Sequence, residues 1–176
     1  NILAGAEYAV FFGGAGVSTD SGIPDFRGNG GLYDSDDDSN EYCLSKECII
    51  GEPERFFTFF RNNMVFSQVE PNAAHIALAK MERAGIIKAV VTQNIDGLHQ
   101  LAGSKRVLEL HGSIYRNYCT ACGKFHTAEF MKNCRHIPRC SCGGIVKPDV
   151  VLYEEGLDQN VLQNSVRFIR NADLLI

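Results

Sequence analysis

Four cysteines are spaced in the way that proteins use to bind a metal ion. Cys119 and Cys122 form a Cys-x-x-Cys pair, and Cys140 and Cys142 form a second close pair further along the chain. Thiolates bind Zn²⁺ in tetrahedral geometry, and a set of four sulfur ligands leaves no position open for a reacting molecule. The sequence therefore predicts one structural Zn²⁺ per chain, with no chemical role.

Polar residues follow two apolar runs that are expected to be neighbouring strands. The run 88–92 is followed by Gln93, Asn94 and Asp96, and the run 106–110 ends directly before His111. Amide and carboxylate groups bind ribose hydroxyls and carboxamides, and a histidine can act as a general base near neutral pH. Ligands of open parallel sheets bind at the carboxyl ends of strands. Helix capping by Asn94 or Asp96 is the structural alternative.

A glycine-rich turn follows the first apolar run, residues 8–12. Residues 13–27 read Gly-Gly-Ala-Gly-Val-Ser-Thr-Asp-Ser-Gly-Ile-Pro-Asp-Phe-Arg. Glycines after a strand let the backbone approach a ligand closely, and the start of the next helix suits a pyrophosphate. The glycine spacing differs from G-x-G-x-x-G, so a purely structural turn is the alternative. The rigid Ile-Pro-Asp-Phe-Arg continuation favours a dinucleotide site on an open α/β sheet.

These motifs together resemble the sirtuins, the NAD-dependent protein-lysine deacylases. The glycine-rich stretch, Thr92-Gln-Asn-Ile-Asp96, Leu110-His-Gly112 and the cysteine pairs occur in the family's order and cover essentially the whole chain. The resemblance implies a bacterial-type member with a Rossmann-like parallel sheet domain and an inserted small zinc-binding module. It also implies NAD as co-substrate and acetyl-lysine proteins or peptides as substrates.

The resemblance assigns roles to individual residues. His111 is implied as the catalytic base, and Asn94 lines the catalytic pocket. The residues implied to bind NAD are Ala15, Gly16, Thr19, Ile23, Asp25, Phe26, Arg27, Gln93, Asn94, Ile95, Asp96 and His111. Val150 and Val151 are implied to pair their backbone with the substrate peptide.

Two positions depart from the family pattern. Tyr153-Glu154-Glu155 stands where sirtuins usually have Phe-Gly-Glu, which leaves substrate preference near that segment open. The second cysteine pair has one intervening residue where the family usually has two to four. Cys134, His126 and His136 therefore remain alternative zinc ligands, although the four paired cysteines are favoured. Cys43 and Cys48 are expected to be ordinary buried thiols.

The resemblance implies a reaction that consumes NAD. The acyl oxygen of the modified lysine attacks the ribose carbon that bears nicotinamide, and nicotinamide leaves. His111 then takes a proton from a ribose hydroxyl, and water completes the release of free lysine and O-acetyl-ADP-ribose. The alternative function is mono-ADP-ribosyl transfer to protein from the same NAD site. A non-catalytic binding module is disfavoured because it would not need a base.

Acyl preference is indicated by residues 56–63. Sirtuins that prefer succinyl or malonyl groups carry a Tyr-x-x-Arg pair before the Pro-Asn segment, but here Thr58 precedes Arg61 at that offset. An acyl carboxylate would lack its partner, so we expect a preference for neutral acyl groups, acetyl first.

The elements that must position these residues follow from apolar spacing. Strands are expected at 8–12, 88–92, 106–110 and 172–176, and helices near 18, at 53–66 and from Pro71 to Gly85. Residues 28–48 are expected to form a loop. We expect residues 1–176 to be one catalytic domain truncated at its C-terminus, with a cofactor loop and helical segment at 28–70 and a zinc module at 116–147.

Composition agrees with an enzyme of this kind. The 176 residues carry a net charge of −4 and are 45% hydrophobic. Such a balance gives no electrostatic footprint for nucleic acid or a membrane surface, so neither is expected as a partner. Seven cysteines, four of them in close pairs, favour a metal site in the reducing cytoplasm over a disulfide scaffold.

Overall fold

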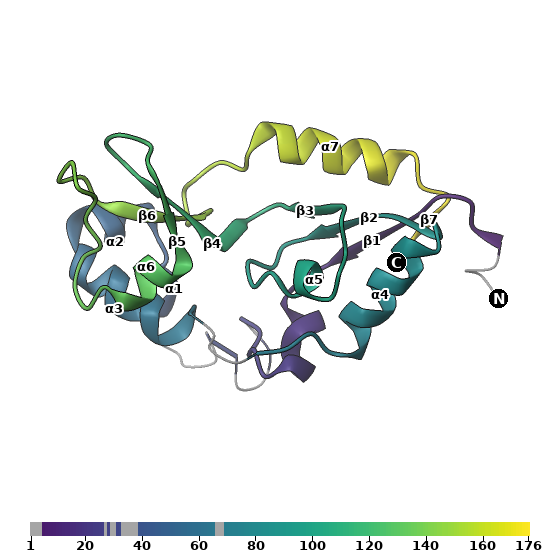
Figure 1. Ribbon diagram of the computed structural model, residues 1–176, viewed down its shortest axis with the longest axis horizontal. Helices are drawn as coiled ribbons and strands as arrows, with labels where there is room; N and C mark the ends of the chain where they lie inside the picture. Colours follow the sequence, from purple (N-terminus) through teal and green to yellow (C-terminus); the bar gives the residue numbers. More distant parts are fainter. Residues whose placement is uncertain (1–4, 27, 29–30, 33–38, 66–68) are drawn as a thin grey trace. The chain divides into compact units, whose positions relative to one another are not determined.

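The computed structural model describes residues 5–26, 28, 31–32, 39–65 and 69–176 (Figure 1). The chain divides into two compact units that are each built from segments far apart in sequence. The first unit contains residues 1–25, 68–111 and 157–176, and the second contains residues 26–67 and 112–156. None of the helices in the described ranges has the length and hydrophobicity needed to span a lipid bilayer.

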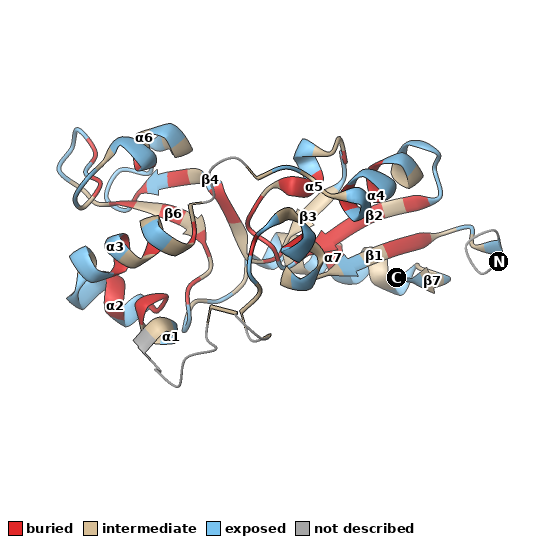
Figure 2. Cartoon of the chain, turned by 90° about the horizontal axis from the view of Figure 1, so that it is seen from below, coloured by how far each residue is buried: buried red, intermediate tan, exposed pale blue. Residues whose placement is uncertain are grey.

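A parallel sheet forms the centre of the first unit. Its strands, in the order β3-β2-β1-β7, are β1 (Ala9–Gly13), β2 (Ile87–Thr92), β3 (Val107–Glu109) and β7 (Leu174–Leu175). All pairings are parallel, and each strand lies within two residues of its predicted bounds. The buried parts of β1 and β2 appear red in Figure 2. The predicted Rossmann-like parallel sheet is confirmed.

Helices cover both faces of this sheet. They are η2 (Ala15–Ser21, a 3-10 helix), α4 (Ala73–Arg83), α5 (Leu98–Leu101) and α7 (Gln159–Arg170). Ala9 packs with Leu78 of α4, whereas Val10 lies in a separate cluster with Leu162 of α7. Because successive strand residues point to opposite faces, α4 and α7 cover opposite sides of the sheet (Figure 1).

The helix after the glycine-rich turn begins earlier than expected. It was predicted to begin near Ser18 or Thr19, but η2 begins at Ala15 and is a 3-10 helix. Its first turn closes by a hydrogen bond from Val17 N to Gly14 O of 3.1 Å. The helix ends at Gly22, whose φ of 86° lies in the left-handed region that glycine adopts without strain.

Helix α4 begins two residues later than the sequence suggested. Pro71 was expected to open it, but Asn72 is the N-cap and its side chain accepts hydrogen bonds from the backbone N–H groups of Ala74 and His75. A capping asparagine satisfies N–H groups that have no partner within the helix, which fixes the start at Ala73.

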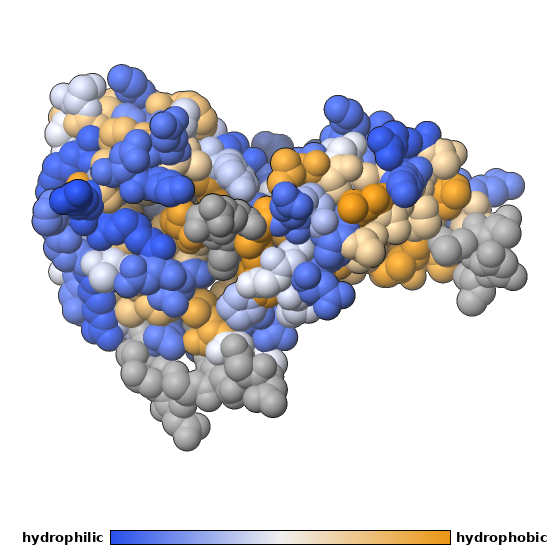
Figure 3. All heavy atoms as spheres, turned by 60° about the horizontal axis from the view of Figure 1, so that its bottom comes forward, coloured by the Kyte–Doolittle hydropathy of each residue, from blue (hydrophilic) through white to orange (hydrophobic). Residues whose placement is uncertain are grey.

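The second unit contains a three-stranded antiparallel sheet in the order β5-β4-β6. Its strands are β4 (Gly112–Cys119), β5 (Phe125–Thr127) and β6 (Val146–Val150), and its helices are α1 (Ser39–Cys43), α2 (Lys46–Gly51), α3 (Pro53–Asn63) and α6 (Ala128–Asn133). The face of this unit that Figure 3 shows, on the left, is largely hydrophilic.

Helices α1 and α2 correct the expectation of a loop over residues 28–48. Ser45 caps α2 by accepting a hydrogen bond from Cys48 N at 3.0 Å, and Cys48 and Ile49 are buried. Burial of one apolar side stabilises short helices whose sequence alone is weakly helical. The predicted aromatic helix is confirmed as α3, with Phe56, Phe57 and Phe60 in the core. Phe66 and the acidic residues 34–38 lie outside the described residues.

Candidate active site and metal centre

The carboxyl ends of β1, β2 and β3 bring the predicted site residues together within the first unit. Gln93 N donates to Gly13 O at 2.9 Å, and Leu110 N donates to Thr92 O at 2.9 Å. Asn94 N donates to the Thr92 hydroxyl at 3.0 Å, which turns the chain after β2. The residues after β2 thus lie beside the glycine-rich turn and the residue before His111.

Ser18 links the glycine-rich turn to the residues after β2. Its hydroxyl donates to Asp96 Oδ2 at 2.7 Å and accepts from Asn94 Nδ2 at 3.0 Å. All three side chains are buried. The other Asp96 oxygen accepts from Leu98 N, the first residue of α5, at 2.9 Å, while Gly97 is the N-cap residue of that helix. The carboxylate thus orders the turn before α5 without being its N-cap, and it belongs to this polar cluster.

His75 completes this cluster from α4. Its Nδ1 accepts a hydrogen bond from Asn72 N at 3.3 Å, so the proton of the neutral ring is on Nε2. Nε2 lies 3.4 Å from the Ser18 hydroxyl, to which it can donate. Burial lowers the pKa of His75, partly opposed by the charge of Asp96. His75 therefore both caps its helix and supports Ser18.

Sequence reasoning missed this role of Ser18 and His75. Ser18 is 78 residues from Asp96 and 57 from His75, so no local pattern joins them. The available signal was a serine inside a glycine-rich turn followed, far along the chain, by a histidine one turn into a capped helix.

His99, on α5, is buried and neither of its ring nitrogens has a hydrogen-bond partner among the described residues. Its ring packs edge-to-face on His75 at 4.7 Å and contacts Phe11 at 5.8 Å. Burial, with a smaller contribution from His75, lowers its pKa to about 4. His99 is thus a neutral core residue, in line with the predicted structural role.

His111 lies just beyond β3 and is partly buried. Burial lowers its pKa, while a hydrogen bond to the backbone of Gln93 acts in the opposite direction. A neutral imidazole at physiological pH has a free lone pair and can accept a proton, which is the property that a general base needs.

The remaining residues predicted to bind NAD divide between the units. Ala15, Gly16, Thr19, Ile23 and Asp25 lie in the first unit, Phe26 is the first residue of the second, and Arg27 lies outside the described residues. Ile23 and Ile95 are buried, whereas Gly16 and Thr19 are exposed. Thr19 donates to Gly16 O at 2.9 Å within η2.

The four predicted zinc ligands converge in the second unit. The Sγ atoms of Cys119, Cys122, Cys140 and Cys142 all lie within 4.8 Å of one another. Three of the separations are 3.4 Å (Cys119–Cys142), 3.4 Å (Cys122–Cys142) and 3.8 Å (Cys122–Cys140). Tetrahedral Zn²⁺ with sulfur at about 2.3 Å requires about 3.8 Å between sulfurs. The donor set fits one structural Zn²⁺.

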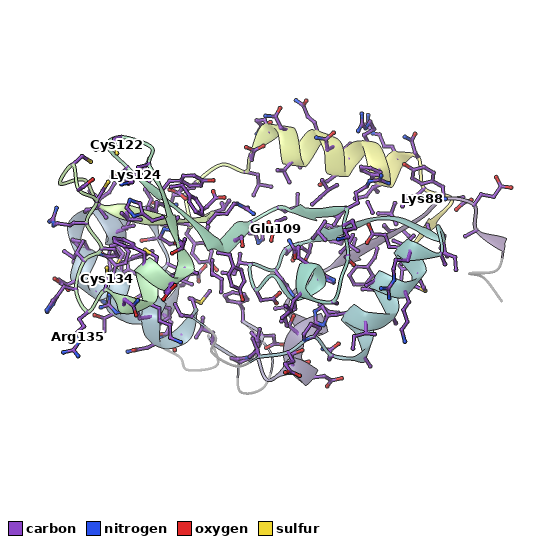
Figure 4. The ribbon with its side chains drawn as sticks, viewed as in Figure 1. Lys88, Glu109, Cys122, Lys124, Cys134 and Arg135 are labelled. Carbon is purple, nitrogen blue, oxygen red and sulfur yellow. The ribbon has the colours of Figure 1, made fainter. Side chains whose placement is uncertain are left out.

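The alternative ligands lie outside this group. Within the described ranges, the cluster contains no histidine and no further cysteine. In Figure 4, Cys134 lies well away from Cys122. Hydrogen bonding from the Cys142 N–H, with a smaller effect of the His126 side chain, lowers the pKa of Cys140 to about 5. The four cysteines are therefore preferred over the substitutes, with His126 adjacent to them.

A glycine makes room for the cluster. A Cβ on Gly144 would lie 2.7 Å from Cys119 Sγ and 2.7 Å from Ala121 Cβ. Gly123 and Gly143 have φ values of 70° and 89°, as the predicted tight turns after each pair require. These glycines let two short loops approach a common centre.

The predicted peptide-binding residues Val150 and Val151 lie at the end of β6. Val150 is buried and pairs with Gly112 of β4, whereas Val151 follows the strand. Among the described residues, the N–H and C=O of Val151 have no hydrogen-bond partner. They could pair with an added peptide strand.

The family comparison decides the identity of this arrangement. The model of the Sir2 family matches residues 14–176, which include the glycine-rich turn, His111 and the four cysteines. The chain belongs to the Sir2 family.

Its relatives include proteins named as NAD-dependent protein deacetylases. This Sir2-family chain is 57% identical over 180 residues to the NAD-dependent protein deacetylase of Clostridium acetobutylicum, covering 99% of this chain and 74% of that protein. It is 55% identical over 170 residues to the enzyme of the same name from Cutibacterium acnes, covering 95% of this chain and 70% of that protein.

Solved Sir2 structures share the fold. One, a Sir2 protein with deacetylated p53 peptide and 3'-O-acetyl-ADP-ribose, matches with a TM-score of 0.90 and 38% identity, covering 99% of this chain and 72% of that one. Another, Sir2 with p53 peptide and NAD⁺, matches with a TM-score of 0.86 and 37% identity, covering 99% and 71%. The sirtuin fold predicted from the motifs is confirmed.

Proposed function

We propose that this Sir2-family protein is an NAD-dependent protein-lysine deacetylase that releases nicotinamide, O-acetyl-ADP-ribose and free lysine. The observation that carries the proposal is the meeting of Ser18, Asn94 and Asp96 in one buried polar cluster at the strand ends that also present His111. The two relatives described above support the proposal, because both are named NAD-dependent protein deacetylase.

NAD would be held by the residues around the carboxyl ends of β1 and β2. When bound, it supplies the ADP-ribose group that takes the acetyl group. Asn94 and Asp96 would orient the nicotinamide end, since an amide and a carboxylate can both bind a carboxamide. His111 would accept the proton of a ribose hydroxyl through its neutral imidazole. The Ser18 hydroxyl fixes both Asn94 and Asp96, so these groups would need no reorganisation when NAD binds.

The acetylated substrate would bind as an extended peptide against Val151. Backbone pairing reads the peptide main chain and is compatible with many sequences. One Zn²⁺ would be held by Cys119, Cys122, Cys140 and Cys142 and would stabilise the second unit without taking part in the reaction.

The deciding experiment is nicotinamide release by the full-length, zinc-loaded protein with and without an acetylated peptide. A deacetylase releases nicotinamide in amounts equal to deacetylated peptide, and mass spectrometry detects O-acetyl-ADP-ribose. A protein ADP-ribosyltransferase would instead release nicotinamide without acetylated peptide and add the mass of ADP-ribose to an acceptor. Nicotinamide release that is independent of the acetyl group would overturn the proposal.

The chemistry of the cysteines also favours a cellular location for the protein. We propose that the protein works in the cytoplasm, where reducing conditions keep its seven cysteines as thiols or metal ligands; the structure contains no disulfide among its described residues. The net charge of −4 favours neither nucleic acid nor an anionic membrane as a partner. Cell fractionation with an antibody against the protein tests the location.

A further inference from the structure

The backbone on either side of Val151 is fixed by hydrogen bonds within the second unit. Before it, Val150 O accepts from Lys147 Nζ at 2.8 Å. After it, Leu152 N donates to Glu155 Oε2 at 3.0 Å. Val151 is thus held between two fixed neighbours while its own N–H and C=O have no partner among the described residues.

One ion pair makes both of these bonds. Lys147 Nζ lies 3.0 Å from the same Glu155 oxygen that accepts from Leu152 N. The two side chains are 22% and 26% exposed, so water screens this pair less than a surface pair. Lysine and glutamate therefore form a bridge across the segment, with one end on Val150 and the other on Leu152.

A tight turn brings Glu155 back to the segment. Glu155 N donates to Leu152 O at 3.0 Å, and Glu154, the third residue of this turn, has a φ of 71°. A positive φ at the third position is the geometry of a type II turn, which glycine adopts most easily. Of the described residues, Glu154 is the only one other than glycine with a positive φ. The chain retains this turn although glutamate is strained there, which is consistent with a requirement to place Glu155.

Tyr153, the second residue of the turn, is anchored to the helical part of the same unit. Its N–H donates to Leu44 O at 3.0 Å, and its C=O accepts from Lys46 N at 3.2 Å. The turn therefore cannot shift along the chain without breaking these hydrogen bonds to Leu44 and to the first residue of α2. The Lys147–Glu155 bridge therefore connects the end of β6 to a turn that is itself hydrogen-bonded to the helical part of the unit.

We propose that Lys147 and Glu155 are positioning residues for substrate, a clamp that keeps Val151 extended and its backbone groups free to pair with the acetylated peptide. This inference rests on the proposed function. Without the clamp, residues 150–152 would have to be ordered when the peptide binds, and that entropic cost would weaken peptide binding. NAD binding and the chemical step do not involve the clamp.

The test replaces each partner in the full-length, zinc-loaded protein. Lys147→Met keeps the length of the side chain and removes its charge, and Glu155→Ala removes the acceptor. Each should raise KM for an acetylated peptide about tenfold, the order expected for hydrogen bonds to charged groups, with kcat and KM for NAD within twofold of wild type. The double variant should be no worse than either single variant, and Lys147→Arg should restore most of the affinity.

The matched control is Arg116→Gln, which breaks the ion pair of Arg116 with Asp149 on the same sheet. Asp149 directly precedes Val150, but this pair makes no hydrogen bond to residues 150–152 that the structure describes. Its KM for peptide should stay within twofold of wild type. Equal increases in all three single variants would mean general loosening of the sheet and would overturn the clamp.

Hydrogen exchange separates the clamp from the proposed function. Leu152 N–H should be protected in the wild type and exchange faster in Lys147→Met and Glu155→Ala, with melting temperature and zinc content retained. If the wild type shows no acetyl-dependent nicotinamide release, the proposed function fails, and acetylated-peptide Kd together with Leu152 exchange still tests the clamp. Unchanged peptide affinity, or unchanged exchange at Leu152, in these variants would refute it.

Discussion

At the scale of single residues, His111 is governed by two opposing effects. Burial disfavours the imidazolium ion, and the hydrogen bond to the Gln93 backbone favours it; burial has the larger effect, so the pKa of His111 lies below its usual value. The basic form is therefore the dominant one throughout the neutral range.

The pH dependence of the reaction should reflect this shift. In the full-length enzyme, kcat/KM for an acetylated peptide should stay level as pH falls from 7.5 to about 6.5 and should decline only below that value, where His111 becomes protonated. His111→Ala should lower deacetylation about 10²–10⁴-fold. Initial rates across pH 5–8 provide the measurement. A decline centred above pH 7, or an unimpaired alanine variant, would contradict the role of His111.

Arg61 is held by the backbone of its own unit. Its Nη1 donates to His136 O at 2.9 Å, so its guanidinium already has a partner. The helix around it presents phenylalanines to the core. Both observations agree with the absence of a Tyr-x-x-Arg pair.

Acyl preference follows from this environment. An acetyl-lysine peptide should have a kcat/KM at least about tenfold higher than its succinyl counterpart, because a buried carboxylate without a cationic partner costs more than 1.4 kcal/mol. The two versions of one peptide are compared under the same NAD concentration. A preference for succinyl-lysine would disprove this prediction and leave family membership unaffected.

At the scale of elements, helices α4 and α5 place two neutral histidines against each other beneath the sheet. His75 has hydrogen-bond partners at both ring nitrogens, whereas His99 has none among the described residues. The pKa of His99 is lowered to about 4, so its protonation in the folded protein is strongly disfavoured.

This pair should make the fold sensitive to acid. Between about pH 6.5 and 4 the unfolded chain takes up a proton at His99 and the folded chain does not, so stability is lost as pH falls through this window, by up to about 1.4 kcal/mol per pH unit. His99→Phe keeps a flat ring and removes the titration, so it should flatten the dependence. Urea unfolding of both proteins at pH 7 and pH 5 gives the loss of unfolding free energy between the two pH values. An equal loss in the wild type and in His99→Phe would contradict the role of His99.

Elements with a strong local signal were predictable, and those that depend on distant partners were not. Strand β1 and residues 89–91 of β2 are continuous apolar runs, which are typical of buried parallel strands. Helices α1 and α2 were missed because their stability comes from burial of residues such as Cys48 and Ile49. The cysteine cluster was predictable because its pairs are close in sequence, but the contact between Ser18 and His75 depends on how η2 and α4 pack.

At the scale of the whole molecule, each unit is closed by segments from distant parts of the chain. In the second unit, β4 supplies Cys119 and the loop before β6 supplies Cys140 and Cys142. A metal bound across these segments joins parts that would otherwise separate on unfolding, so its binding free energy contributes directly to folding.

Loss of zinc should therefore unfold the second unit. Fresh protein should contain one zinc per chain, and Cys140→Ser should lose the metal and most of the cooperative thermal transition, since zinc binding contributes about 10–16 kcal/mol in small peptides. Cys134→Ser is the matched control and should retain both. Elemental analysis and circular dichroism measure these outcomes. Well under one zinc per chain in the wild type would contradict the site.

Gly112, where the chain passes from one unit to the other directly after His111, has a consequence for inherited variation. Its φ is 80°, and any Cβ at this position would overlap the carbonyl oxygen of Asp149. Every missense codon change adds that carbon, so a saturation-mutagenesis library selected for folded protein should be depleted of all variants at position 112. Gly51 has open space around it and should accept many of the same changes. Equal survival of variants at the two positions would show that the overlap is relieved by backbone movement. If instead the overlap excludes these variants, the codon of Gly112, next to that of the proposed base, should be among the slowest to change in any lineage that keeps this fold.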